Sequence, residues 1–249
     1  MNDQRPTKHR LDVLLVARGL VESREKAQRV IRAGLVHSGN ELLDKPGRMV
    51  AEDEAIFIKQ DPAGRYVSRG GLKLEGALAE FRCDVTQRVA LDIGASTGGF
   101  TDCLLQHGAV RIYAVDVGRG QLHQRLIGDA RVVSREKTHL DELRAEDFDP
   151  APELCVADLS FISLRRAFPV IRRVMPWGEA ILLVKPQFEV GREQLPRGGV
   201  VKDEALQRRV LGDLAEAARA EGFEVLGDYE SPITGGDGNR EFFLHLRIG

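Results

Sequence analysis

Four apolar runs of the chain each end in a charged residue. Asp92, Asp116, Asp158 and Lys185 stand where these runs close. Such runs predict buried strands, and a charged residue after a buried strand usually lies in solvent and marks the end of the strand. In an open parallel sheet, however, the carboxyl ends of the strands share one edge, where ligands bind. Asp158 and Lys185, which we expect to end neighbouring strands, could hold a substrate hydroxyl and remove its proton.

A turn of small residues follows the first of these acids. Residues 94–99 have the sequence GASTGG, and helical spacing begins after them. A strand, a glycine turn and a helix N-terminus form a cradle for a nucleotide-like ligand, and Asp116 on the next strand could bind ribose hydroxyls. The turn lacks both the dinucleotide G-x-G-x-x-G spacing and a Walker lysine. The pattern favours a nucleoside without a pyrophosphate, with S-adenosylmethionine (SAM) as first candidate; a ligand-free α/β turn is the alternative.

Composition argues against several classes of protein. The chain has 249 residues, of which 43% are hydrophobic. No apolar run approaches the roughly 20 residues that span a bilayer. The first ten residues lack the apolar segment of a signal peptide. Three separated cysteines without a C-x-x-C pair, and six scattered histidines, predict reduced thiols in a cytoplasmic protein without a metal site.

The N-terminal segment is basic, although the net charge of the whole chain is −2. Residues 5–32 hold eight Lys or Arg and three Asp or Glu, which suits contact with phosphates; by charge alone, a solvated helical face is an equal alternative. Apolar spacing predicts two helices, the second capped by Ser23. Their buried faces carry Leu11, Leu14, Leu15, Ala27, Val30 and Ile31.

The basic segment, RLDVLLVARGLVESREKAQRVIRAGLVHSGN, resembles the S-four RNA-binding domain, named for the fourth small-subunit ribosomal protein. The resemblance implies an RNA-facing side that carries Arg10, Ser23, Arg24, Lys26 and Arg29. A domain this small would bind RNA by shape and backbone charge. We expect this domain at residues 1–60, a connector rich in proline and glycine at 61–71, and a second domain at 72–249.

Strand and helix patterns alternate along the second domain. Strands are expected at 89–92, 110–115, 132–133, 153–157, 180–184, 223–229 and 241–248. The alternation predicts an α/β fold, a Rossmann-like, mostly parallel seven-stranded sheet with helices on both faces. Because no helix separates the last two strands, one strand should be antiparallel.

Nearly the whole chain is similar to the TlyA family, whose members are known as haemolysin A-type proteins and as ribosomal RNA (rRNA) 2′-O-methyltransferases. The similarity rests on the segments YVSRGGLKL, ALDIGASTGGFTDCLL, YAVDVGRGQL, VADLSFISL, LLVKPQFEVGRE and SPITGGDGNREFF. The catalytic half resembles FtsJ-like methyltransferases, whose Lys-Asp-Lys-Glu tetrad falls on Lys73, Asp158, Lys185 and Glu241. The resemblance implies SAM as donor, the 2′-hydroxyl of a cytidine in rRNA as acceptor, and ribosomal subunits as partners. His139 departs from the expected asparagine, which affects how adenine would be contacted.

The tetrad residues have chemical roles on this resemblance. Lys185 is the base or the group that orients the hydroxyl, Lys73 stabilises the developing alkoxide, and the two acids hold the lysines. Around SAM we expect Asp92, Gly94, Ser96, Gly98 and Phe100 at the methionine end, with Asp116 on the ribose. The reaction requires no metal, and we expect a monomer.

Two glycine-rich loops, 190–202 and 235–238, could close over the RNA. Two other functions stay open. One is a non-catalytic ribosome-assembly factor with a vestigial pocket, against which SAM binding would argue. The other is a membrane-lytic protein, as the haemolysin name suggests; the missing apolar span argues against it, and liposome leakage would support it.

Overall fold

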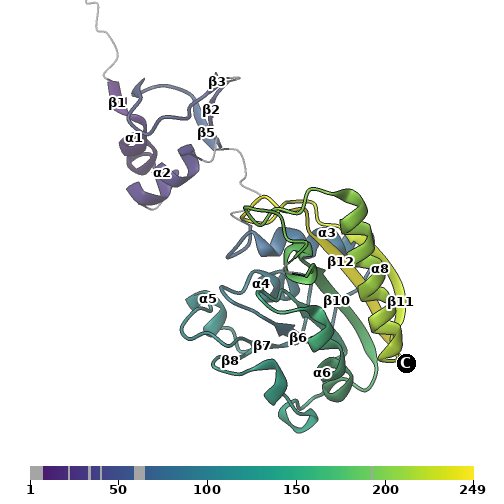
Figure 1. Ribbon diagram of the computed structural model, residues 1–249. Helices are drawn as coiled ribbons and strands as arrows, with labels where there is room; N and C mark the ends of the chain where they lie inside the picture. The colour runs from purple at the N-terminus through teal and green to yellow at the C-terminus, as the bar shows by residue number, and fades with distance from the viewer. Residues whose placement is uncertain (1–7, 22, 33–34, 40, 59–64, 192) are drawn as a thin grey trace, which may run out of the picture. The chain divides into compact units, whose positions relative to one another are not determined.

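The computed structural model describes residues 8–21, 23–32, 35–39, 41–58, 65–191 and 193–249. The chain divides into two compact units, residues 1–65 and 66–249 (Figure 1). The smaller unit has one hydrophobic core, and the larger unit has two. Tyr66 is buried in a core of the larger unit. Residues 66–71, which the sequence placed in the connector, therefore belong to the larger unit, and residues 59–64 lie outside the described part.

The smaller unit combines two helices with two small sheets. Its elements are β1 (Lys8–Arg10), α1 (Leu11–Ala17), α2 (Arg24–Arg32), β2 (Val36–Ser38), β3 (Glu41–Leu42), β4 (Met49–Ala51) and β5 (Ile56–Ile58). Strand β1 pairs with β4, and β2 lies between β3 and β5; all these pairs are antiparallel. The apolar stripes expected from helical spacing are buried together in the core of this unit.

The larger unit is a three-layer α/β domain. Its strands are β6 (Val89–Ile93), β7 (Arg111–Val115), β8 (Val132–Arg135), β9 (Leu154–Ala157), β10 (Gly178–Val184), β11 (Glu224–Glu230) and β12 (Phe242–Ile248). Its α-helices are α3 (Gly70–Glu80), α4 (Gly99–Gln106), α5 (Gln124–Ile127), α6 (Ala167–Val174), α7 (Pro186–Glu189) and α8 (Glu204–Ala220). Short 3-10 turns occur at Leu140–Glu142, Ala145–Asp147 and Leu164–Arg166.

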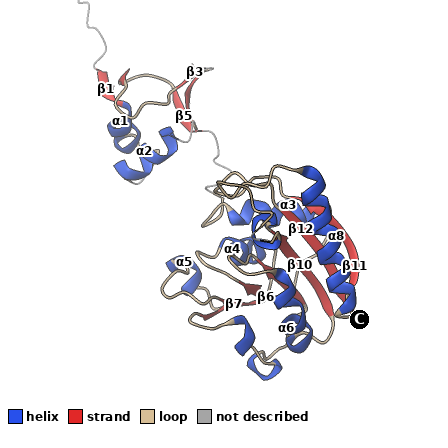
Figure 2. Cartoon of the chain, in the orientation of Figure 1, coloured by secondary structure: helices blue, strands red, loops and turns tan. Residues whose placement is uncertain are grey.

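The seven strands form one sheet in the order β11-β12-β10-β9-β6-β7-β8. Strands β6 to β10 are parallel where they pair, whereas β12 is antiparallel to both of its neighbours. The expected seven-stranded sheet with one antiparallel strand is confirmed. Helices cover both faces of the sheet (Figure 2).

Alternation along the strands separates the two cores. On β6, Leu91 packs into the core that α6 and α8 cover, and Ala90 packs into the core that α3 and α4 cover. A strand buried on both faces needs apolar residues at nearly every position, which explains the continuous apolar runs.

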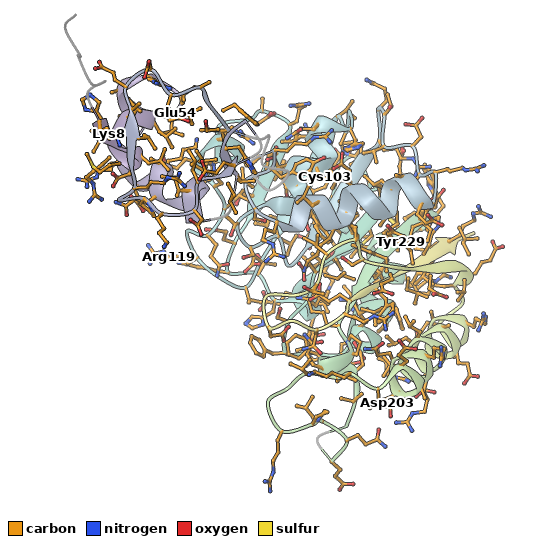
Figure 3. All side chains as sticks on the ribbon, turned by 90° about the horizontal axis from the view of Figure 1, so that it is seen from above. Lys8, Glu54, Cys103, Arg119, Asp203 and Tyr229 are labelled. Carbon is orange, nitrogen blue, oxygen red and sulfur yellow. The ribbon has the colours of Figure 1, made fainter. Side chains whose placement is uncertain are left out.

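Outside the sheet, Asp203 accepts backbone hydrogen bonds from Ala205 and Leu206 and caps the first turn of α8 (Figure 3).

Candidate active site

One edge of the sheet collects the charged residues expected at strand ends. Strands β10, β9, β6 and β7 are parallel neighbours, so their carboxyl ends lie along the same edge. Asp92 is the last residue but one of β6, and Asp116, Asp158 and Lys185 directly follow β7, β9 and β10. This is the edge at which parallel sheets bind ligands.

Asp158 and Lys185 form an ion pair across adjacent strands. The Lys185 amine contacts Asp158 Oδ1 and donates a hydrogen bond to Ser160 Oγ at 3.0 Å. The Lys185 side chain is 11% exposed. The Phe188 ring centroid lies 5.9 Å from the same nitrogen, within the range of a cation–π contact. These three neighbours hold the amine in place.

Lys73 and Glu241 form a second, more deeply buried pair. Helix α3 begins at Gly70, so Lys73 is its fourth residue. Its Nζ donates to Glu241 Oε2 at 2.5 Å, and both residues are buried. Burial raises the pKa of the Glu241 carboxyl, and the charge of Asp158 raises it further. The hydrogen bond from Lys73 and the charge of Lys185 act in the opposite direction and lower it. The structure therefore brings the other three predicted tetrad residues, Lys73, Asp158 and Lys185, within electrostatic reach of Glu241.

Two adjoining cavities open at this edge. The first, of about 410 Å³, is lined by two of the four tetrad residues, Lys73 and Asp158, and is named the tetrad cavity. The second, of about 510 Å³, is lined by Asp116 and is named the Asp116 cavity. Gly94, Ser96 and Asp158 line both cavities, so the two cavities adjoin each other.

The Asp116 cavity fits a nucleoside such as the adenosine part of SAM. The Asp116 carboxylate accepts hydrogen bonds from the backbone N–H of Ser96 at 2.8 Å and of Gly118 at 2.7 Å. Each of its oxygens keeps a lone pair that a ribose hydroxyl could use. Leu140 offers an apolar face in the same cavity, and His139 lines it too. Contact between His139 and an adenine ring stays a prediction.

The backbone of the glycine turn packs closely against other segments of the larger unit. Gly94 has a φ of +82°, and a Cβ there would lie 2.5 Å from the carbonyl oxygen of Asp158. Gly98 has a φ of +98°, and its Cβ would lie 2.2 Å from a methyl group of Leu126. The positive φ values, together with close packing against the protein's own chain, favour glycine at both positions. Phe100 lines the tetrad cavity, whereas Gly98 lines neither cavity.

Asp92 is fully buried and lines neither cavity. Its Oδ2 accepts a hydrogen bond from Thr101 Oγ1 at 2.6 Å, and its Oδ1 has no partner among the described residues. Burial raises the pKa of Asp92 to about 7, and the nearby charges of Asp158 and Asp116 add to this shift. Its contact with the methionine amine stays a prediction.

Phe161, which sequence reasoning did not select, stands at the mouth of the Asp116 cavity. Its side chain is 87% exposed, and its φ of +67° is strained for a residue other than glycine. Its ring centroid lies 5.2 Å from that of Phe188. The one signal in the sequence was an aromatic residue shortly after an acid that ends a strand.

In the smaller unit, Arg10 and Arg24 both bond to the buried carboxylate of Asp12, which sequence reasoning also missed. Ser23 Oγ accepts a hydrogen bond from the backbone N–H of Lys26 at 3.2 Å, as expected of a helix cap. The side chain of Arg29 lies outside the described part of the chain. Contact of these residues with RNA stays a prediction.

Asn239 connects the two glycine-rich loops. Its buried amide accepts a hydrogen bond from the backbone N–H of Val201 at 2.8 Å and donates one to the carbonyl of Gly199 at 3.0 Å. Residue 192 of the first loop lies outside the described residues. Closure of these loops over RNA stays a prediction.

The described residues contain no group of three or more His, Cys, Asp or Glu arranged to hold a metal ion. In the same part of the chain, no helix has both the length and the apolar character needed to cross a membrane. Cys83, Cys103 and Cys155 form no disulfide among the described residues, and burial raises the pKa of Cys83 to about 12.

Comparison with known families matches both units. Residues 66–248 match the model of FtsJ-like methyltransferases, and residues 9–56 match that of the S4 domain. A candidate rRNA methyltransferase of Bacillus subtilis, YqxC, is 52% identical over 96% of this chain and 85% of its own. The 16S/23S rRNA (cytidine-2′-O)-methyltransferase TlyA of Mycobacterium tuberculosis is 43% identical over 96% of this chain and 89% of its own. A solved structure from Streptococcus thermophilus, described as a hemolysin candidate, has a TM-score of 0.75 at 44% identity over 98% of this chain and 90% of its own.

Proposed function

Because the chain belongs to the FtsJ-like methyltransferase family, and within it to the TlyA group, we propose that it methylates the 2′-hydroxyl of a ribose in rRNA with SAM as donor. The acceptor that we propose is a cytidine, as in the name of the relative from M. tuberculosis. The S-four unit would bind the rRNA that carries the target.

One observation carries this proposal: Lys73, Asp158, Lys185 and Glu241 converge from four separate elements of the larger unit. They do so beside the Asp116 cavity, where a nucleoside fits. Methyl transfer to a ribose needs a donor site and a proton acceptor side by side. The arrangement supplies both.

The reaction requires that the 2′-hydroxyl lose its proton as the methyl group arrives. SAM, held by Asp116 and the 94–99 turn, would supply a methyl group on a positively charged sulfur. Lys185 in its neutral amine form would accept the proton from the hydroxyl oxygen, and Asp158 and Ser160 would stabilise the ammonium that results. Lys73, fixed by Glu241, would stabilise negative charge on the ribose oxygen. Alignment of acceptor and donor would supply much of the rate.

The test is transfer of labelled methyl from SAM to purified small and large ribosomal subunits. Label that survives alkali as a resistant dinucleotide identifies 2′-O-methylation. Lys185→Ala should abolish the label. Lys185→Arg keeps the cation but cannot release its proton, so it should also be inactive if Lys185 is the base.

One outcome would contradict the proposed function, and another would contradict the role of Lys185 as the base. SAM binding without label in either subunit would favour the assembly factor. Activity retained in Lys185→Arg would leave methyl transfer intact and reduce Lys185 to an electrostatic role.

A further inference from the structure

Asp12 gathers hydrogen-bond donors from three residues in the core of the smaller unit. Its Oδ1 accepts from Arg10 Nε at 3.0 Å, and its Oδ2 accepts from Arg10 Nη2 at 3.0 Å. The same Oδ2 accepts from Arg24 Nε at 2.9 Å and from Gln28 Nε2 at 3.0 Å. Arg10 ends β1 and Arg24 begins α2, so the carboxylate joins two elements. The bonds from Arg10 hold the pKa of Asp12 well below its usual range.

These contacts leave the outer ends of both guanidinium groups open. The side chains of Arg10 and Arg24 are 46% and 57% exposed, whereas that of Asp12 is fully buried. Arg24 bonds to Asp12 through Nε alone, and its two terminal nitrogens have no acceptor among the described residues. A guanidinium presents its N–H groups in a rigid plane that matches a phosphate. Two fixed guanidinium groups therefore present unused donors to solvent. Arg10, Arg24 and Asp12 together carry a net charge of +1.

We propose that Asp12 is a positioning residue that arranges Arg10 and Arg24 as a clamp for a backbone phosphate of rRNA. The inference rests on the proposed function, because it assumes that the smaller unit binds rRNA. Free arginine side chains lose rotamer freedom when they bind a phosphate. Here the fold has already ordered them, so binding does not carry that cost. Asp12 acts only through the arginines, since its buried carboxylate cannot touch the ligand.

Asp12→Asn distinguishes an effect of positioning from an effect of net charge, because the two explanations predict opposite changes in affinity for rRNA. If net charge alone mattered, loss of an acid would strengthen binding to a polyanion. Positioning predicts weaker binding, because asparagine has one acceptor oxygen and its amide N–H groups would face the arginine donors. We expect about ten-fold weaker binding and a shallower dependence of affinity on salt.

The experiment uses the full chain and the ribosomal subunit that the wild type methylates. Affinity is measured by filter binding at several salt concentrations, and methyl transfer is measured at saturating subunit. Asp12→Asn should raise Kd and leave kcat unchanged, because the tetrad lies in the larger unit. Arg24→Lys keeps the charge but loses the planar fork, so it should weaken binding in the same direction. In the double variant the two losses should not add, because both remove the same clamp.

Gln28→Ala is the matched control, because it removes a donor to the same carboxylate without a change of charge. It should bind rRNA within about two-fold of wild type, since both arginines keep their bonds to Asp12. Equal or tighter binding by folded Asp12→Asn, with normal methylation, would overturn the inference and leave the proposed function intact. Absence of both binding and methylation in the wild type would instead refute the proposed function.

Circular dichroism checks that each variant folds. If Asp12→Asn does not fold, Arg10→Lys and Arg24→Lys decide the question. Unchanged affinity in both of these charge-conserving variants would overturn the clamp, and weakened affinity in both would support it.

Discussion

Removal of the Glu241 carboxylate should destabilise the larger unit, because it leaves the Lys73 ammonium buried without its partner. The two charges lie 2.5 Å apart, and the residues are 9% and 3% exposed. Breaking a buried ion pair from one side costs about 3–5 kcal/mol. Lys73 also lines the tetrad cavity, where water can reach it. We therefore expect Glu241→Ala to lower the free energy of unfolding by about 3 kcal/mol, the lower end of that range.

A second substitution tests the reason for this loss. Lys73→Met in the Glu241→Ala background removes the unpaired charge and keeps much of the side-chain volume. The double variant should therefore regain most of the lost stability. It should still fail to transfer methyl, since both groups are absent. Stability that returns without activity would separate the structural role of the pair from its chemical role.

The assay is urea denaturation followed by the fluorescence of Trp177. This is the single tryptophan of the chain and lies in the larger unit, so the signal reports that unit. A loss of about 3 kcal/mol corresponds to a fall of about 6–12 °C in Tm for a unit of this size. Glu230→Gln is the control, because its pair with Arg240 is exposed and should contribute little.

The reasoning is refuted if Glu241→Ala unfolds at the same urea concentration as the wild type. It is refuted equally if the double variant is no more stable than the single one. Either result would mean that water or another group solvates the Lys73 ammonium once Glu241 is gone.

Three further predictions follow from single side chains. Asp116→Ala should weaken SAM binding by about ten-fold or more in calorimetry, because hydrogen bonds to a charged group are lost. Asp92 has a pKa of about 7 in the fold and a usual value of 3.8, so the native state holds more protons than the unfolded state between these values. Stability should therefore fall as pH rises from about 4 to 7, and Asp92→Asn, a neutral mimic, should flatten this fall in urea midpoints. Asn239→Ala should speed amide hydrogen exchange at Val201, since its acceptor is lost; exchange confined to residues 235–238 would contradict the link between the loops.

Local patterns were sufficient to predict most elements of the fold. The apolar runs of the strands and the helical spacing around Leu11 are read from neighbouring residues, and the structure buries most of these positions. The sequence did not place the beginning of α3, because Gly70 and Gly71 predict a break and fell within the expected connector. In the structure, Tyr66 packs so closely on Gly71 that a Cβ there would lie 2.2 Å from its ring, which explains glycine at this helical position.

Some residues of the site could likewise be placed from local patterns, and others could not. Asp92, Asp116, Asp158 and Lys185 could be placed at one edge of the sheet because each ends an apolar run. Lys73 and Glu241 are 168 residues apart in the chain, and only a family resemblance joined them beforehand. No local pattern contains a pairing of this kind.

The amino-acid sequence by itself determined the order of the elements, the strand-end charges and the basic character of the N-terminal segment, because these are properties of neighbouring residues. Tertiary structure alone decided which charges are buried and with which partners. Asp12 looks like a solvated acid near the start of a helix, yet Arg10, Arg24 and Gln28 enclose it. Burial and pairing depend on atoms that distant segments bring together, and the state of a charge follows from its surroundings rather than from its place in the chain.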